Sequence, residues 1–170
     1  LLTRVKGPGG APAEVAKVLD FGIAKVLRSE AGVDALETQA GTVFGTPRYM
    51  SPEQAQGKAL DARSDLYALA VILFQMIAGR PPFEDEDAVV VMARHIKTPP
   101  PKLSEIAKDL AIPRELDAVI DETLAKDPQK RPSSAAELAT RLEAAVAGWS
   151  PDVTARPQAQ LTVPPPKTTI

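Results

Sequence analysis

Few side chains in this 170-residue sequence have types and positions that suggest chemistry. The sequence has no cysteine, which excludes a disulfide framework, a thiolate metal site and a cysteine nucleophile. It has one histidine, His95, so a multi-histidine metal site is excluded as well. We expect His95 to be an ordinary polar residue on a helix. Asp20-Phe21-Gly22 is more distinctive, because it follows an apolar strand that would hold the carboxylate of Asp20 at the end of a rigid element.

Two polar stretches follow Gly22. The residues from Arg28 to Val43 are polar and small and have no sustained hydrophobic period, so we predict a loop there. A loop of this length in a compact domain is usually functional or disordered. The next stretch, Gly45 to Gln54, contains Ser51 followed by Pro52, which fits the N-cap and first residue of a short helix.

The element that must position these stretches is an apolar helix predicted over residues 65–79. One face of it carries apolar residues at helical spacing, namely Leu66, Leu69, Ala70, Leu73 and Ile77. The other faces are also apolar, with Val71, Ile72, Phe74 and Met76. This pattern predicts a helix that is buried on all sides. The run is shorter than the ~20 residues that cross a bilayer, and either Ser64 or Asp61 can cap its start.

The remaining elements are predicted from their periodicity and their turn residues. Strands are expected at residues 1–5 and 14–19 around a Gly/Pro turn, which together suggest a hairpin. Further amphipathic helices are expected at residues 88–96, 114–124 and 133–147. The acids from Glu84 to Asp87 suit the start of the first of these helices. From Gly148 onward the chain is rich in Pro, Thr and Gln, which is typical of a disordered linker.

Composition and charge narrow the choice of partners. The net charge is -2, so there is no broad basic field, and neither nucleic acid nor an anionic membrane is the indicated partner. Neither a signal peptide nor a transmembrane stretch is visible in the sequence. The first residue is Leu rather than Met, which is compatible with a chain that begins inside a longer protein.

Four motifs in this order resemble the C-terminal lobe of a bacterial serine/threonine protein kinase. They are the stretches Lys17–Lys25, Gly45–Glu53, Asp61–Leu69 and Lys130–Pro132. The resemblance implies a mainly α fold, a kinase-like C-lobe around a buried central helix with a small β-hairpin at the N-terminal end. It also implies that the N-lobe and the catalytic loop are absent. We therefore expect a partial kinase domain at residues 1–147 and a linker at residues 148–170.

The resemblance also implies roles for residues on the reaction side of the lobe. Asp20, with Phe21 and Gly22 in the same turn, would bind the Mg²⁺ that bridges the phosphates of ATP. Thr46 would support the catalytic Asp and help shape the pocket for the residue after the phosphoacceptor. Thr42 and Thr38 are two alternative activation-loop phosphosites, where a phosphate could order the loop against an Arg.

Three further residues have structural roles through the same resemblance. Glu53 and Arg131 are expected to form a buried ion pair, for which the planar fork of Arg is well suited. Asp65 would accept backbone N–H groups of the catalytic loop, and without that loop it would keep only a capping role at the start of the central helix.

The implied function is ATP-dependent phosphoryl transfer to Ser or Thr hydroxyls of a protein substrate. The motifs that hold the nucleotide and supply the general base would lie before Leu1, so we expect the 170 residues alone to be inactive. The alternative is a non-catalytic, pseudokinase-like module that binds partners around Gly45–Tyr49 and Ala88–Ile96. A cytoplasmic location is expected, on its own or as part of a membrane-anchored parent. The family also allows a homodimer for activation-loop phosphorylation.

Overall fold

The computed structural model describes residues 2–6, 12–16 and 47–151. These residues belong to two compact units, which divide between Thr42 and Val43. The predictions made for Asp20, Phe21, Gly22, Thr38, Thr42 and Thr46 lie outside the described residues, as does most of the predicted linker.

The described part of the first unit is a β-hairpin. Strand β1 (Leu2–Lys6) pairs antiparallel with strand β2 (Pro12–Ala16), so that Leu2 lies opposite Ala16 and Lys6 lies opposite Pro12. The hairpin expected from the sequence is therefore confirmed, although β2 begins earlier than its periodicity predicted.

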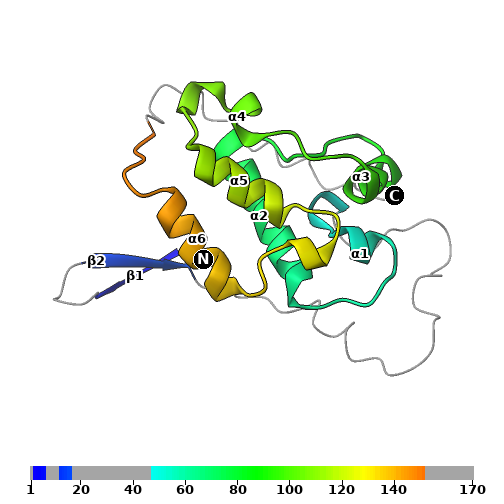
Figure 1. The fold of residues 1–170 in the computed structure, drawn as a ribbon, viewed down its shortest axis with the longest axis horizontal. Coiled ribbons are helices and arrows are strands. Elements are labelled where there is room, and N and C mark those ends of the chain that lie inside the picture. The colour runs from blue at the N-terminus through cyan, green and yellow to red at the C-terminus, as the bar shows by residue number, and fades with distance from the viewer. Residues whose placement is uncertain (1, 7–11, 17–46, 152–170) are drawn as a thin grey trace, which may run out of the picture. The chain divides into compact units, whose positions relative to one another are not determined.

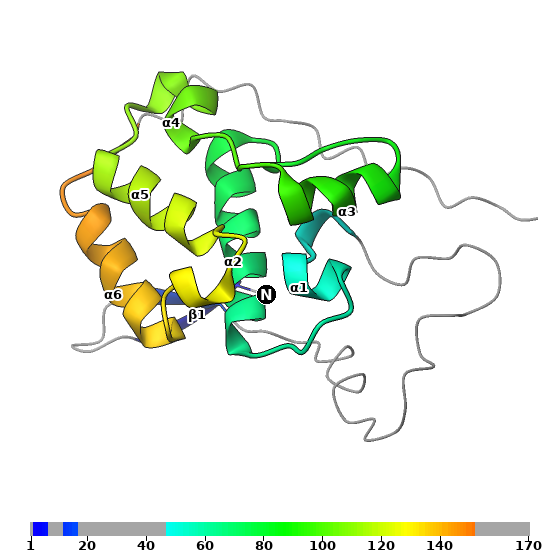
Figure 2. The same ribbon diagram turned by 45° about the vertical axis from the view of Figure 1, so that its right-hand side comes forward.

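The second unit is helical. Its α-helices are α1 (Pro52–Ala55), α2 (Ala62–Ala78), α3 (Ala88–Lys97), α4 (Leu103–Ile106), α5 (Arg114–Thr123) and α6 (Ala135–Ala145). Its 3-10 turns are η3 (Pro47–Tyr49), η4 (Lys108–Leu110) and η5 (Pro128–Lys130). In both ribbon views α2 lies at the centre, with α1 and α3 to one side and α5 and α6 to the other (Figure 1 and Figure 2). The predicted mainly helical fold around a central helix is confirmed.

The ends of α2 follow from its sequence. Asp61 is the N-cap, and its side chain accepts a hydrogen bond from the backbone N–H of Arg63 at 2.8 Å. Gly79 ends the helix with a φ of 78°, a left-handed conformation that favours glycine. Of the two predicted caps, Asp61 is therefore the one used, and Ser64 is buried within the first turn.

The prediction that α2 is buried on all sides is wrong for this chain. Its buried residues are Ser64, Leu66, Tyr67, Ala70, Val71 and Phe74. Leu69 and Ile72 are 41% and 42% exposed, and Met76 is 73% exposed. These three residues lie at helical spacing on one face. An apolar residue is buried only where a neighbouring element covers it, and composition does not reveal which faces have neighbours.

One hydrophobic core joins α2 to α5 and α6. Phe74 and Val71 of α2 belong to the same buried cluster as Leu116 and Ile120 of α5 and Leu138 of α6. Burial of apolar side chains of this size is the main source of stability for such a unit, at ~1.5–3 kcal/mol each. Among the described residues, we find no helix with the length and apolar character that crossing a membrane requires.

Candidate functional site

Residues 47–53, which we call the anchored segment, combine a 3-10 turn with the start of a short helix. In η3, the backbone N–H of Met50 donates to the carbonyl of Pro47 at 3.2 Å. Ser51 then caps α1. Its hydroxyl accepts from the N–H of Gln54, and the Gln54 side chain accepts from the N–H of Ser51. This reciprocal cap places Glu53 in the first turn of α1, where it is buried.

Glu53 is joined to Arg131, which lies 78 residues further along the chain. Nη1 of Arg131 donates to Oε1 of Glu53 at 2.7 Å, and Nη2 donates to Oε2 at 2.8 Å. The side chains are 0% and 6% exposed for Arg131 and Glu53, so the pair is shielded from water. Two parallel bonds of this kind fix the orientation of both groups as well as their distance.

The guanidinium of Arg131 also holds three backbone carbonyls. Its Nε donates to Ala125 at 2.8 Å, Nη1 donates to Arg63 at 3.0 Å and Nη2 donates to Lys126 at 3.3 Å. With the two bonds to Glu53, these contacts occupy all five N–H donors that an Arg side chain carries. Arg131 therefore ties α1, α2 and the chain after α5 together at one point.

The acidity of Glu53 follows from these contacts. Burial by itself raises the pKa of Glu53, but hydrogen bonds from Arg131 and from the Ser64 hydroxyl, with the charge of Arg131, outweigh it. The net result lowers the pKa of Glu53 from 4.5 to about 2. Glu53 is therefore ionised throughout the neutral range.

His95 is the second anchor, and the sequence did not indicate its importance. It is 0% exposed, so the expectation of an ordinary polar helix residue is wrong. Its Nε2 lies 3.0 Å from the carbonyl oxygen of Arg48, and its Nδ1 lies 2.9 Å from the hydroxyl of Tyr67. The signal that could have found it is its spacing of four residues from Val91, the other buried residue of α3.

The hydrogen bonds define the form of the imidazole. A carbonyl oxygen can only accept, so Nε2 of His95 carries the proton toward Arg48. In the neutral ring Nδ1 is then an acceptor, and the Tyr67 hydroxyl donates to it. Burial lowers the pKa of His95 from 6.5 to about 4; the nearby charge of Lys126 adds to this, and the bond to Arg48 partly opposes it.

Weaker contacts complete the anchoring. The hydroxyl of Tyr49 donates to Oε1 of Gln75 on α2 at 2.8 Å. The guanidinium of Arg48 lies 3.8 Å from the carboxylate of Glu84, and both side chains are more than a third exposed. An exposed pair at this distance contributes little stability. The segment is thus held from α2, α3 and the chain after α5.

The acidic run before α3 is largely a helix start, as expected. Asp87 caps α3 by accepting from the N–H of Val89 at 2.8 Å. Arg94 binds back to this run, donating to the carbonyl of Glu84 and to the carboxylate of Asp85 at 2.8 Å. Asp85 and Asp87 are therefore paired within their own helix and turn.

Asp65 does not have the capping role that we expected for it. It is exposed in the first turn of α2, and the N-cap is Asp61. The physical reason is that an N-cap must have extended backbone angles, which Asp61 has at φ -135° and ψ -177°, whereas Asp65 lies within the helix.

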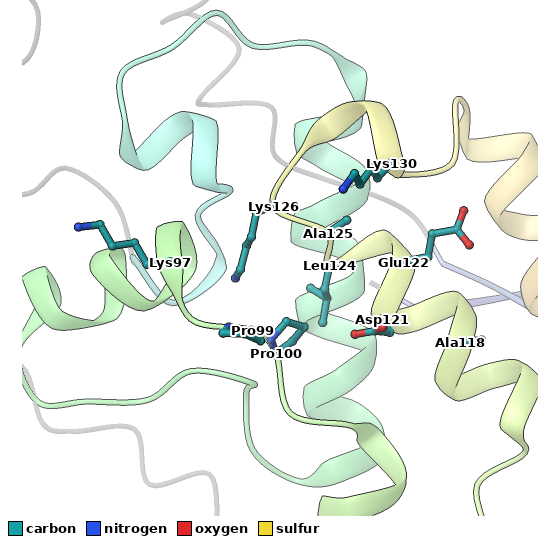
Figure 3. A pocket seen from close by; sticks show the side chains of 10 residues that line it. All are labelled: Lys97, Pro99, Pro100, Ala118, Asp121, Glu122, Leu124, Ala125, Lys126 and Lys130. Carbon is teal, nitrogen blue, oxygen red and sulfur yellow. The ribbon is translucent and has the colours of Figure 1, made fainter.

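A pocket of about 520 Å³ lies between the end of α3 and the end of α5, and its lining includes Ala125 and Lys126, whose carbonyls accept from Arg131. Its lining residues are Lys97, Pro99, Pro100, Ala118, Asp121, Glu122, Leu124, Ala125, Lys126 and Lys130. Pro99 and Pro100 lie beside Leu124, while Lys97 and Glu122 lie toward opposite ends (Figure 3). In the part of the chain that the structure describes, no three acidic or histidine side chains are grouped so as to hold a metal ion.

Comparisons with known proteins agree with this architecture. A family model described as the protein kinase domain matches residues 10–142. The serine/threonine-protein kinase pkn3 of Myxococcus xanthus is 47% identical over 128 residues, which cover 75% of this chain and 23% of that protein. PknB of Mycolicibacterium smegmatis is 41% identical over 136 residues, which cover 80% of this chain and 21% of that protein.

A solved structure of the PknI kinase domain of Mycobacterium tuberculosis is 34% identical, with a TM-score of 0.47 over 60% of this chain and 36% of that one. The chain spans about a fifth of the length of the curated relatives that it matches. The family match covers most of the chain, and the relatives named above are serine/threonine kinases of bacteria. The chain therefore belongs to the protein kinase domain family, on its bacterial serine/threonine side.

Proposed function

We propose that this chain carries the activation segment and C-lobe of a serine/threonine protein kinase, which transfers the γ-phosphoryl group of ATP to Ser or Thr hydroxyls of a protein. The observation that supports it best is the anchored segment, whose backbone and side chains are held from α2, α3 and Arg131. Phosphoryl transfer depends mainly on positioning and on charge stabilisation, so a fixed surface for the substrate is what the reaction needs from this lobe.

Asp20 is the proposed metal ligand. A carboxylate is the ligand type that Mg²⁺ prefers, and Asp20-Phe21-Gly22 would place it beside ATP. When bound, Mg²⁺ would offset negative charge on the phosphates. Thr46, which directly precedes the anchored segment, would support the catalytic Asp and shape the pocket for the substrate residue after the phosphoacceptor.

Thr42 and Thr38 are the proposed sites of activating phosphorylation. A phosphate at either position would add up to two negative charges and could pair with an Arg. Phosphorylation of one copy by another would require a transient homodimer.

We further propose that the kinase part comprises residues 1–147 and that a Pro- and Thr-rich linker comprises residues 148–170. The protein would act in the cytoplasm, where ATP is available.

We also propose that the 170 residues alone do not transfer phosphate. Of the residues that the family uses to hold the nucleotide and its metal and to accept the substrate proton, only Asp20 has a counterpart among them. Purified chain, incubated with Mg²⁺, radiolabelled ATP and histone as a basic protein substrate, should give no more incorporation than the Asp20→Asn variant. Incorporation above that control would contradict the proposed inactivity.

A chimera tests the kinase assignment itself. The upstream part of the pkn3 kinase domain from Myxococcus xanthus would be joined to residues 1–170 at the start of the matching region. We expect this chimera to phosphorylate the substrate and Asp20→Asn to abolish the activity, while Glu143→Gln, at an exposed position of α6, should leave it unchanged. A folded but inactive chimera would instead favour the alternative of a non-catalytic binding module.

A further inference from the structure

We propose that His95 is a positioning residue for substrate binding, because its Nε2–H holds the Arg48 carbonyl in the segment that would face the substrate peptide. The inference rests on the proposed function for the identity of the substrate. The hydrogen bonds that carry it belong to the fold itself.

The Arg48 carbonyl needs a partner from outside its own turn. The hydrogen bond within η3 joins Met50 to Pro47, and the bond to Arg48 comes from α3, 47 residues away. A backbone acceptor that loses its partner in a partly buried setting carries a desolvation penalty, so the turn would shift to find another donor. The position of Arg48 therefore depends on His95.

The packing around the imidazole leaves it little freedom to rotate. Its ring meets Phe83 edge-on, with centroids 5.0 Å apart and planes at 77°, and it meets Tyr67 at 5.7 Å and 64°. The Tyr67 hydroxyl occupies Nδ1, so the only N–H of the neutral ring points at Arg48. A side chain bonded at both nitrogens and packed edge-on against two rings is preorganised as a donor.

Burial, with a nearby cation, keeps His95 in this neutral donor form. Lys126 lies with Nζ 4.3 Å from the centre of the Phe83 ring, and its Nζ donates to the Arg94 carbonyl at 3.4 Å. The guanidinium of Arg131 lies 4.8 Å from the centre of the Tyr67 ring. The charge of Lys126 opposes a positive charge on the imidazole.

Tyr67 links the two ends of the anchored segment. Through its hydroxyl it orients His95, which holds Arg48, and its ring lies against Arg131, which holds Glu53. His95 has no exposed surface, so it cannot touch a substrate and must act through the Arg48 backbone. The expected effect of losing it is weaker binding of the peptide, with ATP binding unchanged.

The first test uses nuclear magnetic resonance of the 170-residue chain, which does not depend on kinase activity. At pH 7, the ¹⁵N spectrum of His95 should show a protonated Nε2 and an unprotonated Nδ1. Tyr67→Phe should allow the other tautomer to appear, and His95→Phe should speed exchange of the amide hydrogens of residues 48–50. A dominant Nδ1–H form in the unchanged chain would overturn the inference.

The second test uses the kinase chimera and a matched set of variants. His95→Phe keeps a ring but loses the donor, His95→Gln keeps an N–H donor without the ring, and Glu143→Gln changes an exposed residue of α6. We expect His95→Phe to raise the KM for the peptide about tenfold, with the KM for ATP unchanged. His95→Gln should restore most of the loss, and Glu143→Gln should have no effect.

Equal effects of His95→Phe on the KM values for peptide and ATP, or no rescue by a folded His95→Gln, would overturn the positioning role. Circular dichroism and thermal melting establish whether each variant is folded. If His95→Phe does not fold, Tyr67→Phe serves as an independent variant that removes the hydrogen bond to Nδ1 of His95. If the unchanged chimera were inactive, the proposed function would fail, while the spectroscopic result would still decide whether His95 positions Arg48.

Discussion

At the scale of single residues, the two groups that hold the anchored segment are buried and chemically opposite. Glu53 is kept charged by a fully paired Arg131, and His95 is kept neutral by burial. The pKa of each group in the folded chain differs from that in the unfolded chain. The free energy of unfolding therefore depends on pH through each of them.

Replacing one partner of the ion pair should be costly. We expect Glu53→Gln to lower the free energy of unfolding by ~3–5 kcal/mol, because Arg131 then keeps its charge in a site without a counter-charge. Urea unfolding of the 170-residue chain at pH 7 measures the change. The control is Glu143→Gln, an exposed position of α6, for which a change under ~0.5 kcal/mol is expected. Equal effects of the two variants would contradict the role given to the pair.

The pKa of His95 predicts a second pH dependence. Below pH 6.5 His95 is protonated in the unfolded chain, whereas in the folded chain it is protonated only below about pH 4. The free energy of unfolding should therefore fall as the pH falls from 6.5 to about 4. The full effect is about 3 kcal/mol. Glu53 acts at lower pH, and its contribution is lost between pH 4.5 and about 2.

Urea unfolding midpoints measured from pH 7 to pH 4 should show the His95 contribution, and His95→Gln should flatten the curve within that window because Gln does not titrate. The steeper fall below pH 4.5 should remain in this variant, since it belongs to Glu53 and other carboxylates. A curve for His95→Gln that matches the unchanged chain would show that the dependence comes from other groups.

At the scale of elements, α2 has one covered and one uncovered face. Phe74 is 1% exposed in the core, and Met76, two residues later, is 73% exposed. We expect Phe74→Ala to cost ~3–5 kcal/mol, through lost apolar burial and the cavity left behind. Met76→Ala should stay within ~0.5 kcal/mol. Thermal or urea unfolding of both variants measures the contrast, and a cost for Met76→Ala comparable to that of Phe74→Ala would mean that this face is covered in solution.

The start of α2 shows that residue type alone does not identify the N-cap of a helix, because the backbone conformation decides between several suitable residues. Asp61, Ser64 and Asp65 are all of a type that can cap a helix, and the sequence offered each of them. Only Asp61 has the extended backbone that a cap requires. Ser64, one turn further in, instead donates to Glu53 at 2.7 Å.

At the scale of the whole molecule, the helical unit gathers residues from distant parts of the chain onto a short segment. Residues 47–53 are held by Gln75, His95 and Arg131, from α2, α3 and the end of η5. The chain covers about a fifth of the length of its curated relatives. This lobe would contribute a fixed platform for the substrate.

The sequence by itself determined the family, the helical class and the approximate helix positions. Hydrophobic periodicity and capping residues are local properties, and motifs such as Gly45–Glu53 and Lys130–Pro132 are read without coordinates. The pairing of Glu53 with Arg131 could be expected only through the family, since no local rule relates residues 78 positions apart.

Only the tertiary structure decided which side chains are covered and which polar groups meet. It placed His95 between Tyr67 and Arg48, and it left Met76 exposed although its helix is apolar on nearly every face. The physical reason is that burial and long-range hydrogen bonding depend on which elements pack against each other. That arrangement is a property of the whole fold, and a residue's type or its neighbours in sequence do not contain it.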